Sequence, residues 1–208
     1  MLDPTKSAEV RRILDRYVVE VVEKYELCPW ARTARERGEV GIEIIAGQPS
    51  MEVWIAAAKA ALAGPSIRVA MVIAPELVIE RVAFHDVRNH VADAMPGTGV
   101  AEFHPHAAID LTTSARLVPF LRRSPDPLLQ LVPLHLLESV RAIPQWDLVK
   151  QAQMLAGSAE PTRDVAAQLA AANHAMVTAN RAAIEAALDD IAADRNATYV
   201  RVGLSAGP

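Results

Sequence analysis

The segment IRVAMVIAP, residues 67–75, already restricts the fold of this chain. Its near-continuous apolar and β-branched character is typical of a strand that is covered on both faces, because a strand with one wet face alternates apolar and polar residues. The segments on either side, residues 51–64 and 76–95, have apolar residues at helical spacing. A strand between two such segments indicates a sheet covered by helices.

The remaining segments continue this alternation. Asp3 and Pro4 are typical of a helix start, and apolar residues at helical spacing follow to a predicted end near Leu27, because Pro29 disfavours helical geometry at the residue before it. Further strands are predicted over residues 40–47, 99–106 and 128–137, and the last of them turns into a short helix. Residues 107–127 are predicted as a long connection. Helix is expected from Ile143 onward, with one long helix over 162–194.

Together these segments predict an α/β fold, an α+β sandwich in which a sheet of about four strands is packed by helices, with a helical C-terminal segment. We expect residues 1–142 to form the core domain and residues 143–208 to form a helical extension packed on it. The sequence contains neither of the standard glycine-rich phosphate-binding motifs and no G-x-S-x-G motif.

Charge and composition exclude several classes of protein. A formal net charge of -4 and a pI near 5.9 argue against a nucleic-acid-binding protein. No uncharged apolar run reaches the length of about 18 residues that a membrane span needs, and the charged N-terminus lacks the apolar segment of a signal peptide. We therefore expect a cytoplasmic protein. Cys28 is the only cysteine, which excludes an intramolecular disulfide and a multi-cysteine zinc site.

The stretch AEFHPHAAID, residues 101–110, contains the first candidate site. If it is extended, Glu102, His104 and His106 share one face. Two imidazoles and a carboxylate suit iron, copper, nickel or zinc and leave coordination positions open. A single axial histidine, or His104 as an acid or base, is an alternative, and so is a histidine that hydrogen-bonds a loop while His106 is solvated.

Cys28 is the second candidate. It follows the first helix and precedes several arginines, which would lower the pKa of its thiol and favour the thiolate. A thiolate can act as a nucleophile or as an axial haem ligand. The alternative is that Cys28 is a small buried apolar residue.

Arg122, Arg123, Ser124 and Asp126 form the third candidate group, restrained by prolines at 125 and 127. Arginines in such a loop can bind a carboxylate or a phosphate. Alternatively, Arg123 pairs with an internal acid and fixes the loop.

Three pieces of the chain, LCPWA at 27–31, FHP at 103–105 and RSPDPLLQL at 123–131, resemble motifs of an uncharacterised bacterial family, domain of unknown function 1415. The resemblance spans roughly residues 18–141 and implies the fold and the candidate positions, but no reaction. This chain has Trp30 where phenylalanine is usual, Asp126 in place of an aromatic residue and Arg122 where asparagine is common. Its long alanine-rich C-terminal helix also differs from a typical member.

From these candidates we predict a small-molecule enzyme whose pocket gathers the CPWA turn, the FHPH strand end and the RSPDP loop. Its most concrete form is an iron- or haem-dependent oxidoreductase, with His104 as metal ligand or acid–base group. In that form Arg122 and Arg123 bind an anionic substrate or cofactor. Arg123 and Ser124 are also candidate catalytic residues, together with His104 and Cys28. A cofactor-free thiol or acid–base enzyme using Cys28 and a histidine is one alternative. A non-enzymatic homodimer or interaction protein, assembled through the alanine-rich helix, is the other.

Overall fold

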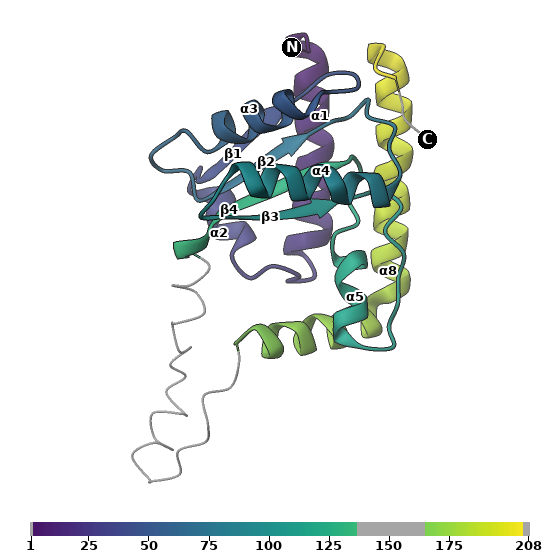
Figure 1. The fold of residues 1–208 in the computed structure, drawn as a ribbon. Helices are drawn as coiled ribbons and strands as arrows, with labels where there is room; N and C mark the ends of the chain where they lie inside the picture. The colour runs from purple at the N-terminus through teal and green to yellow at the C-terminus, as the bar shows by residue number, and fades with distance from the viewer. Residues whose placement is uncertain (1, 137–164, 206–208) are drawn as a thin grey trace.

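The computed structural model describes residues 2–136 and 165–205, and Figure 1 shows how its elements are arranged. The helices are α1 (Pro4–Tyr17), the π-helix η1 (Val18–Glu23), α2 (Ala31–Glu36), α3 (Met51–Ala61), α4 (Arg81–Ala94), α5 (Ser114–Leu121) and α8 (Val165–Val202). The strands are β1 (Val40–Ile44), β2 (Val69–Ile73), β3 (Thr98–Phe103) and β4 (Leu128–Pro133). The predicted helix over 143–161, and the boundary predicted at 142, lie outside the described residues.

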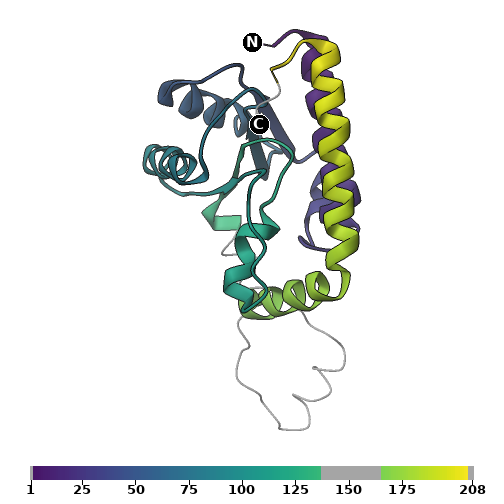
Figure 2. The same cartoon turned by 90° about the vertical axis from the view of Figure 1, so that its right-hand side faces the viewer.

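The four strands form one mixed sheet in the order β1-β2-β4-β3. β1 and β2 are parallel, and β4 runs antiparallel to both β2 and β3. Helices α3 and α4 cover one face of the sheet, while α1 and α8 lie on the other (Figures 1 and 2). The predicted class is confirmed: this is an α+β fold with a four-stranded sheet and a long C-terminal helix.

The central strand β2 shows why helices cover both faces. Ala70 and Val72 are fully buried against the α3 and α4 side, where Trp54 and Phe84 pack with ring centroids 5.6 Å apart. The next residue, Ile73, is buried in the opposite cluster with α1, η1, α5 and α8. Because successive strand side chains point to opposite faces, an apolar run such as this one is stable only between two layers.

The predicted start of the first helix is also confirmed. The Asp3 carboxylate accepts hydrogen bonds from the backbone amides of Thr5 and Lys6, at 2.9 and 3.0 Å. The helical path continues as the π-helix η1 and ends in a turn in which Glu26 has a φ of 51°. A positive φ is uncommon for a residue with a side chain, so this turn is held in a strained conformation.

Helix α8 packs the C-terminal part of the described chain against its N-terminal helix. It packs on α1, where Arg12 and Arg16 each donate to the Asp194 carboxylate at 2.7 Å. Asn180 interrupts its helical geometry with φ −119° and ψ 15°, and Figures 1 and 2 show the bend between the two halves of the helix. None of the described helices is long and apolar enough to cross a membrane.

Two predictions about the middle of the chain are wrong. Strand β3 ends at Phe103, so the two histidines that follow leave the sheet and do not continue its face. The segment predicted as a connection contains α5, which begins where the Thr113 hydroxyl accepts a hydrogen bond from the Arg116 amide. The helix was not predicted because Pro119 lies inside it and turn-forming residues surround it.

Candidate functional site

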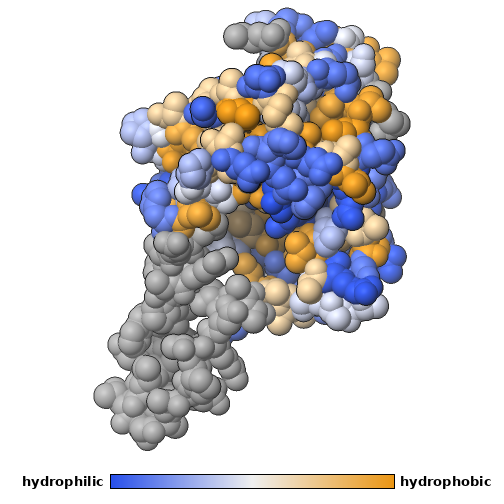
Figure 3. Space-filling model, viewed as in Figure 1, coloured by the Kyte–Doolittle hydropathy of each residue, from blue (hydrophilic) through white to orange (hydrophobic). Residues whose placement is uncertain are grey.

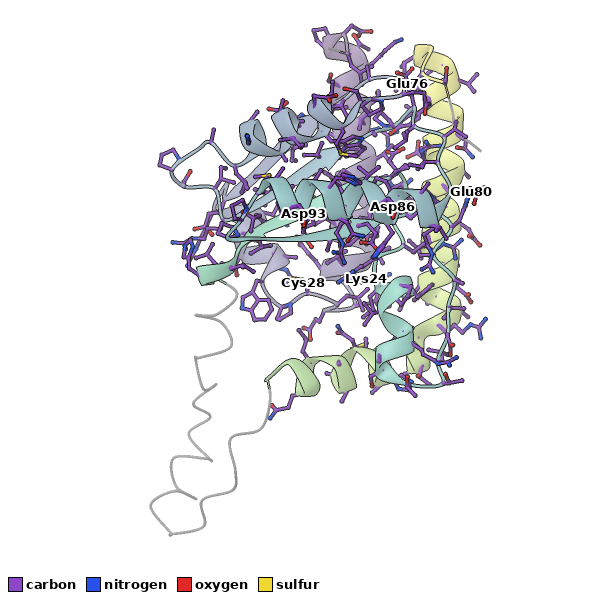
Figure 4. All side chains as sticks on the ribbon, in the orientation of Figure 1. Lys24, Cys28, Glu76, Glu80, Asp86 and Asp93 are labelled. Carbon is purple, nitrogen blue, oxygen red and sulfur yellow. The ribbon has the colours of Figure 1, made fainter. Side chains whose placement is uncertain are left out.

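A cavity of about 580 Å³ lies beside the CPWA turn, residues 28–31, between η1, α2 and the N-terminal half of α8. Figure 4 labels Cys28 in this turn, below the sheet. The described residues that line it are Glu23, Tyr25, Glu26, Cys28, Pro29, Trp30, Arg32, Thr33, Gln168, Leu169, Ala172, Asn173 and Met176. Thus a segment near the N-terminus and the alanine-rich helix close to the C-terminus share one site.

The Cys28 thiol is half-buried in the cavity wall. Burial raises the pKa of the Cys28 thiol above its ordinary value, while hydrogen bonds from the backbone of Trp30 and Ala31 act in the opposite direction. The prediction that nearby arginines would lower this pKa is wrong. Arg35 is instead engaged by Glu23, with its Nε 2.7 Å from the Glu23 Oε1, and Arg32 lies 3.6 Å from the same carboxylate.

Irregular backbone and a buried amide shape this cavity. The π-helix η1 ends at Glu23, and Glu26 holds its positive φ three residues later. The buried side chain of Asn173 donates to the Leu27 carbonyl at 3.1 Å and ties α8 to the turn. π-helical segments and strained residues concentrate at functional sites, so these features favour a functional role for the turn.

The mouth of the cavity offers both apolar and polar contacts. The indole of Trp30 remains 42% exposed, which is unusual for so large an aromatic group, and Leu169, Ala172 and Met176 supply further apolar surface. Arg32 contributes a cation whose side chain is 63% exposed. A concave surface that presents apolar, charged and amide groups together can hold and orient a small molecule.

His104 occupies a different position from the one predicted. Its side chain is buried, Nε2 donates to the Ile79 carbonyl at 3.0 Å, and Nδ1 accepts from the His106 amide at 3.1 Å. Burial lowers the pKa of His104 and favours the neutral ring. Both ring nitrogens are therefore already used, and a metal ion could bind His104 only by displacing one of these bonds.

The predicted metal group of Glu102, His104 and His106 is not assembled. The Glu102 carboxylate lies 3.0 Å from His85 Nδ1 and 3.1 Å from Arg88 Nε, on α4. Within residues 2–136 and 165–205, no three His, Cys, Asp or Glu side chains are grouped so that they could hold a metal ion. The reason is that β3 ends between the carboxylate and the histidines, so the alternation on which the prediction rested stops.

The RSPDP loop, residues 123–127, is fixed by its own contacts. The buried Ser124 hydroxyl donates to the Asp126 carbonyl at 2.6 Å. The Asp126 carboxylate is buried, accepting from Arg195 Nε at 2.7 Å and from the Tyr199 hydroxyl at 2.6 Å. Burial raises the pKa of Asp126, while Arg195 opposes that shift. These contacts anchor the loop to α8.

The FHP and RSPDP motifs contact each other but do not line the Cys28 cavity. The His104 amide donates to the Arg122 carbonyl at 3.0 Å, and Arg123 Nε donates to the Pro105 carbonyl at 3.1 Å. The Arg123 guanidinium also lies 3.9 Å from Asp189, an exposed acid on α8. Of the predicted site residues, the structure thus groups His104, Arg122 and Arg123, whereas Cys28 faces a separate cavity with α8.

Sequence reasoning missed Glu23 and Glu26 as cavity residues, and Arg195 and Tyr199 as partners of the RSPDP loop. These residues carry no local motif, and their roles depend on contacts between segments far apart in the chain. Asn173 carried one weak signal, because it is a polar residue that is buried within a helix composed mostly of alanine.

The model of one protein family, described as Protein of unknown function (DUF1415), matches residues 9–156, which is more than half of the chain. The chain belongs to this family. The match includes all three motifs and ends before α8 begins. Comparison with curated proteins and with solved structures finds no match.

Proposed function

We propose that this family member is a cofactor-free enzyme that acts on a small organic molecule in the cavity at the CPWA turn, with Cys28 as its nucleophile. One observation carries the proposal: the only thiol of the chain lies in the wall of a cavity of about 580 Å³. That volume suits a metabolite-sized ligand.

The lining residues suggest how such a substrate would be held. The exposed face of Trp30 and the thioether of Met176 offer contact to an apolar or planar part of the molecule. Arg32 and the amide of Gln168 offer polar contacts at the same cavity. Arg32 is suited to a carboxylate, which is consistent with the anionic substrate expected from the sequence.

The raised pKa of the Cys28 thiol means that a base must accept its proton during attack. Two carboxylates line the cavity. Glu23 is bound by Arg35, which lowers the pKa of that carboxyl and makes it a weak base. Glu26 makes no side-chain hydrogen bond or ion pair with the described residues, so we assign the role of base to Glu26.

In the proposed step, the sulfur forms a bond to an electrophilic carbon of the substrate while the thiol proton passes to Glu26. The electron pair of the carbon–heteroatom π bond moves onto the heteroatom. The amides of Trp30 and Ala31 stabilise negative charge on the sulfur as the proton leaves. The iron- or haem-dependent alternative is a prediction that the geometry favours less, because both ring nitrogens of His104 are hydrogen-bonded.

Alkylation by iodoacetamide tests the reactivity of the thiol. Because Cys28 is the only cysteine, the mass of the intact protein reports its modification directly. We expect the folded protein to react slowly at neutral pH and faster as the pH rises, because the thiolate is the reactive form. Glu26→Gln should slow the reaction several-fold at neutral pH, whereas Glu36→Gln, an exposed acid of α2 outside the cavity, should leave it unchanged.

A panel of small aldehydes and thioesters tests catalysis itself. The wild-type protein should convert at least one of them at a rate that Cys28→Ser abolishes and a metal chelator does not change. A thiol that is inert while the protein is folded, or equal turnover by wild-type and Cys28→Ser, would contradict the proposal. Loss of turnover with the chelator would favour the metal-dependent alternative.

A further inference from the structure

A second site, independent of the Cys28 cavity, is indicated by the unpaired cation of Arg122. Arg122 is the C-cap residue that follows α5. Its carbonyl accepts a hydrogen bond from the His104 amide at 3.0 Å, which holds Arg122 beside the end of β3. Its side chain is half-buried. Within the parts of the chain that the structure describes, its guanidinium has no hydrogen bond and no ion pair.

The carboxylate near Arg122 is already occupied. Glu102, two residues before His104 in the chain, places one oxygen 3.0 Å from His85 and the other 3.1 Å from Arg88. Arg88 therefore adds a second permanent cation to the same region. The region therefore contains two guanidinium groups and one carboxylate, which leaves one positive charge without a negative partner.

The cost of this arrangement follows from the chemistry of arginine. Burial and the charge of Arg88 lower the pKa of Arg122, and Glu102 opposes them. A guanidinium nevertheless keeps its proton in proteins, so Arg122 cannot become neutral in response to burial. A half-buried cation that repels its neighbour is unfavourable unless an anion accompanies it. Most other arginines of the described chain have carboxylate partners, among them Arg12, Arg16 and Arg35.

We propose that Arg122, together with Arg88, binds the oxyanion of a small ligand, a phosphate or a carboxylate, at the junction of the FHP and RSPDP motifs. Planar guanidinium groups bind both anions through paired N–H donors. His106 is exposed next to His104, with ring centroids 5.4 Å apart, and offers a further donor near the site. In Figure 3 the exposed surface of α4, which carries Arg88, forms a hydrophilic band on the face shown. Neither arginine lines the Cys28 cavity, so this site goes beyond the proposed enzyme.

Titration with inorganic phosphate and, separately, with acetate tests the site, with sodium chloride keeping the ionic strength constant. Binding is followed by calorimetry and by the NMR resonance of the Arg122 Nε–H group. We expect saturable binding of one or both anions. Arg122→Gln should weaken it by about tenfold or more, equivalent to about 1.4 kcal/mol. Arg116→Gln, an exposed arginine of α5 that pairs with Asp110, is the matched control and should bind as wild type does.

The outcomes separate the ligand sources and the two proposals. Saturation by phosphate alone identifies a phosphate site, saturation by acetate alone identifies a carboxylate site, and saturation by both supports a general oxyanion site. If Arg122→Gln does not fold, two other measurements test the site. They are the saturable shift of the Arg122 Nε–H resonance in the wild-type protein and the anion affinity of the Arg88→Gln variant. Absence of saturable binding, or a wild-type affinity in Arg122→Gln, overturns the inference. Cys28→Ser should bind the anion normally, so failure of one proposal leaves the other standing.

Discussion

The buried pair of Asp126 and Arg195 gives the sharpest test of how α8 is attached to the rest of the fold. Their side chains are only 4% and 7% exposed and lie 2.7 Å apart. Arg195 also donates to the Pro75 carbonyl and lies 4.6 Å from the ring centre of Tyr199. Replacing Asp126 with asparagine keeps its size but leaves a buried guanidinium without a negative charge.

The expected loss follows from burial. Removing one partner of a buried ion pair costs about 3–5 kcal/mol of unfolding free energy, because the remaining charge is buried away from water with no opposite charge to compensate. We expect Asp126→Asn at the lower end of that range, since its amide oxygen can still accept a hydrogen bond. Tyr199→Phe removes only the 2.6 Å hydrogen bond to the carboxylate and should cost about 1.5–3 kcal/mol.

Urea denaturation of Asp126→Asn, Arg195→Met and the double variant measures these losses and their coupling. The double variant should lose less than the two single variants added together, because neither charge is left alone. Arg181→Met is the control on the same helix. Its partner Glu185 is one turn away and its side chain is 51% exposed, so about 0.5 kcal/mol is expected. A loss below about 1 kcal/mol in Asp126→Asn, or strict additivity, would refute the reasoning.

Two further predictions concern stability. Arg12 and Arg16 hold the pKa of Asp194 well below its ordinary value. The ionised Asp194 carboxylate therefore stabilises the folded protein at a pH above the ordinary carboxyl pKa, and this stabilisation is lost as the pH falls below that value. Asp194→Asn should therefore cost about 1–2 kcal/mol at pH 7 and less toward pH 2; an equal cost at both pH values in urea titrations would contradict this. Gly41→Ala would place its Cβ in steric overlap with the backbone oxygen of Ala61, so we expect a lower Tm and a loss of about 1–3 kcal/mol. Gly64→Ala meets only the flexible Ile67 side chain, at 2.8 Å, and should cost less; equal Tm values for the two variants would count against this packing argument.

The Asp126 pair also connects the part of the chain that the family model matches to a helix beyond it. Asp126 lies within the matched residues 9–156, whereas its partners Arg195 and Tyr199 lie on α8, beyond them. An isolated aspartate at a buried position would be unfavourable, and an arginine on a packed helix would be equally so. The two are compatible because each supplies the charge that the other needs.

The candidate site was only partly predictable. The motif at Cys28 pointed to a turn that lines a cavity, because a cysteine before a proline at the end of a helix is a local feature. The other wall of the cavity comes from α8, about 140 residues later in the chain, and no local pattern connects the two. The predicted histidine group failed for a related reason: its alternation depended on where β3 ends, which the pairing of the strands with β4 decides.

The alternation of apolar runs and helical periods determined the layered fold, since each segment can bury its apolar side chains only against another layer. It also placed the first helix cap and the central strand, because both depend on neighbouring residues. Tertiary structure alone decided which opposite charges lie together: Glu23 with Arg35, Glu102 with Arg88, and Asp126 with Arg195. Such pairs form wherever packing brings opposite charges together. The separation of two residues in the sequence does not indicate whether they will be close in the fold.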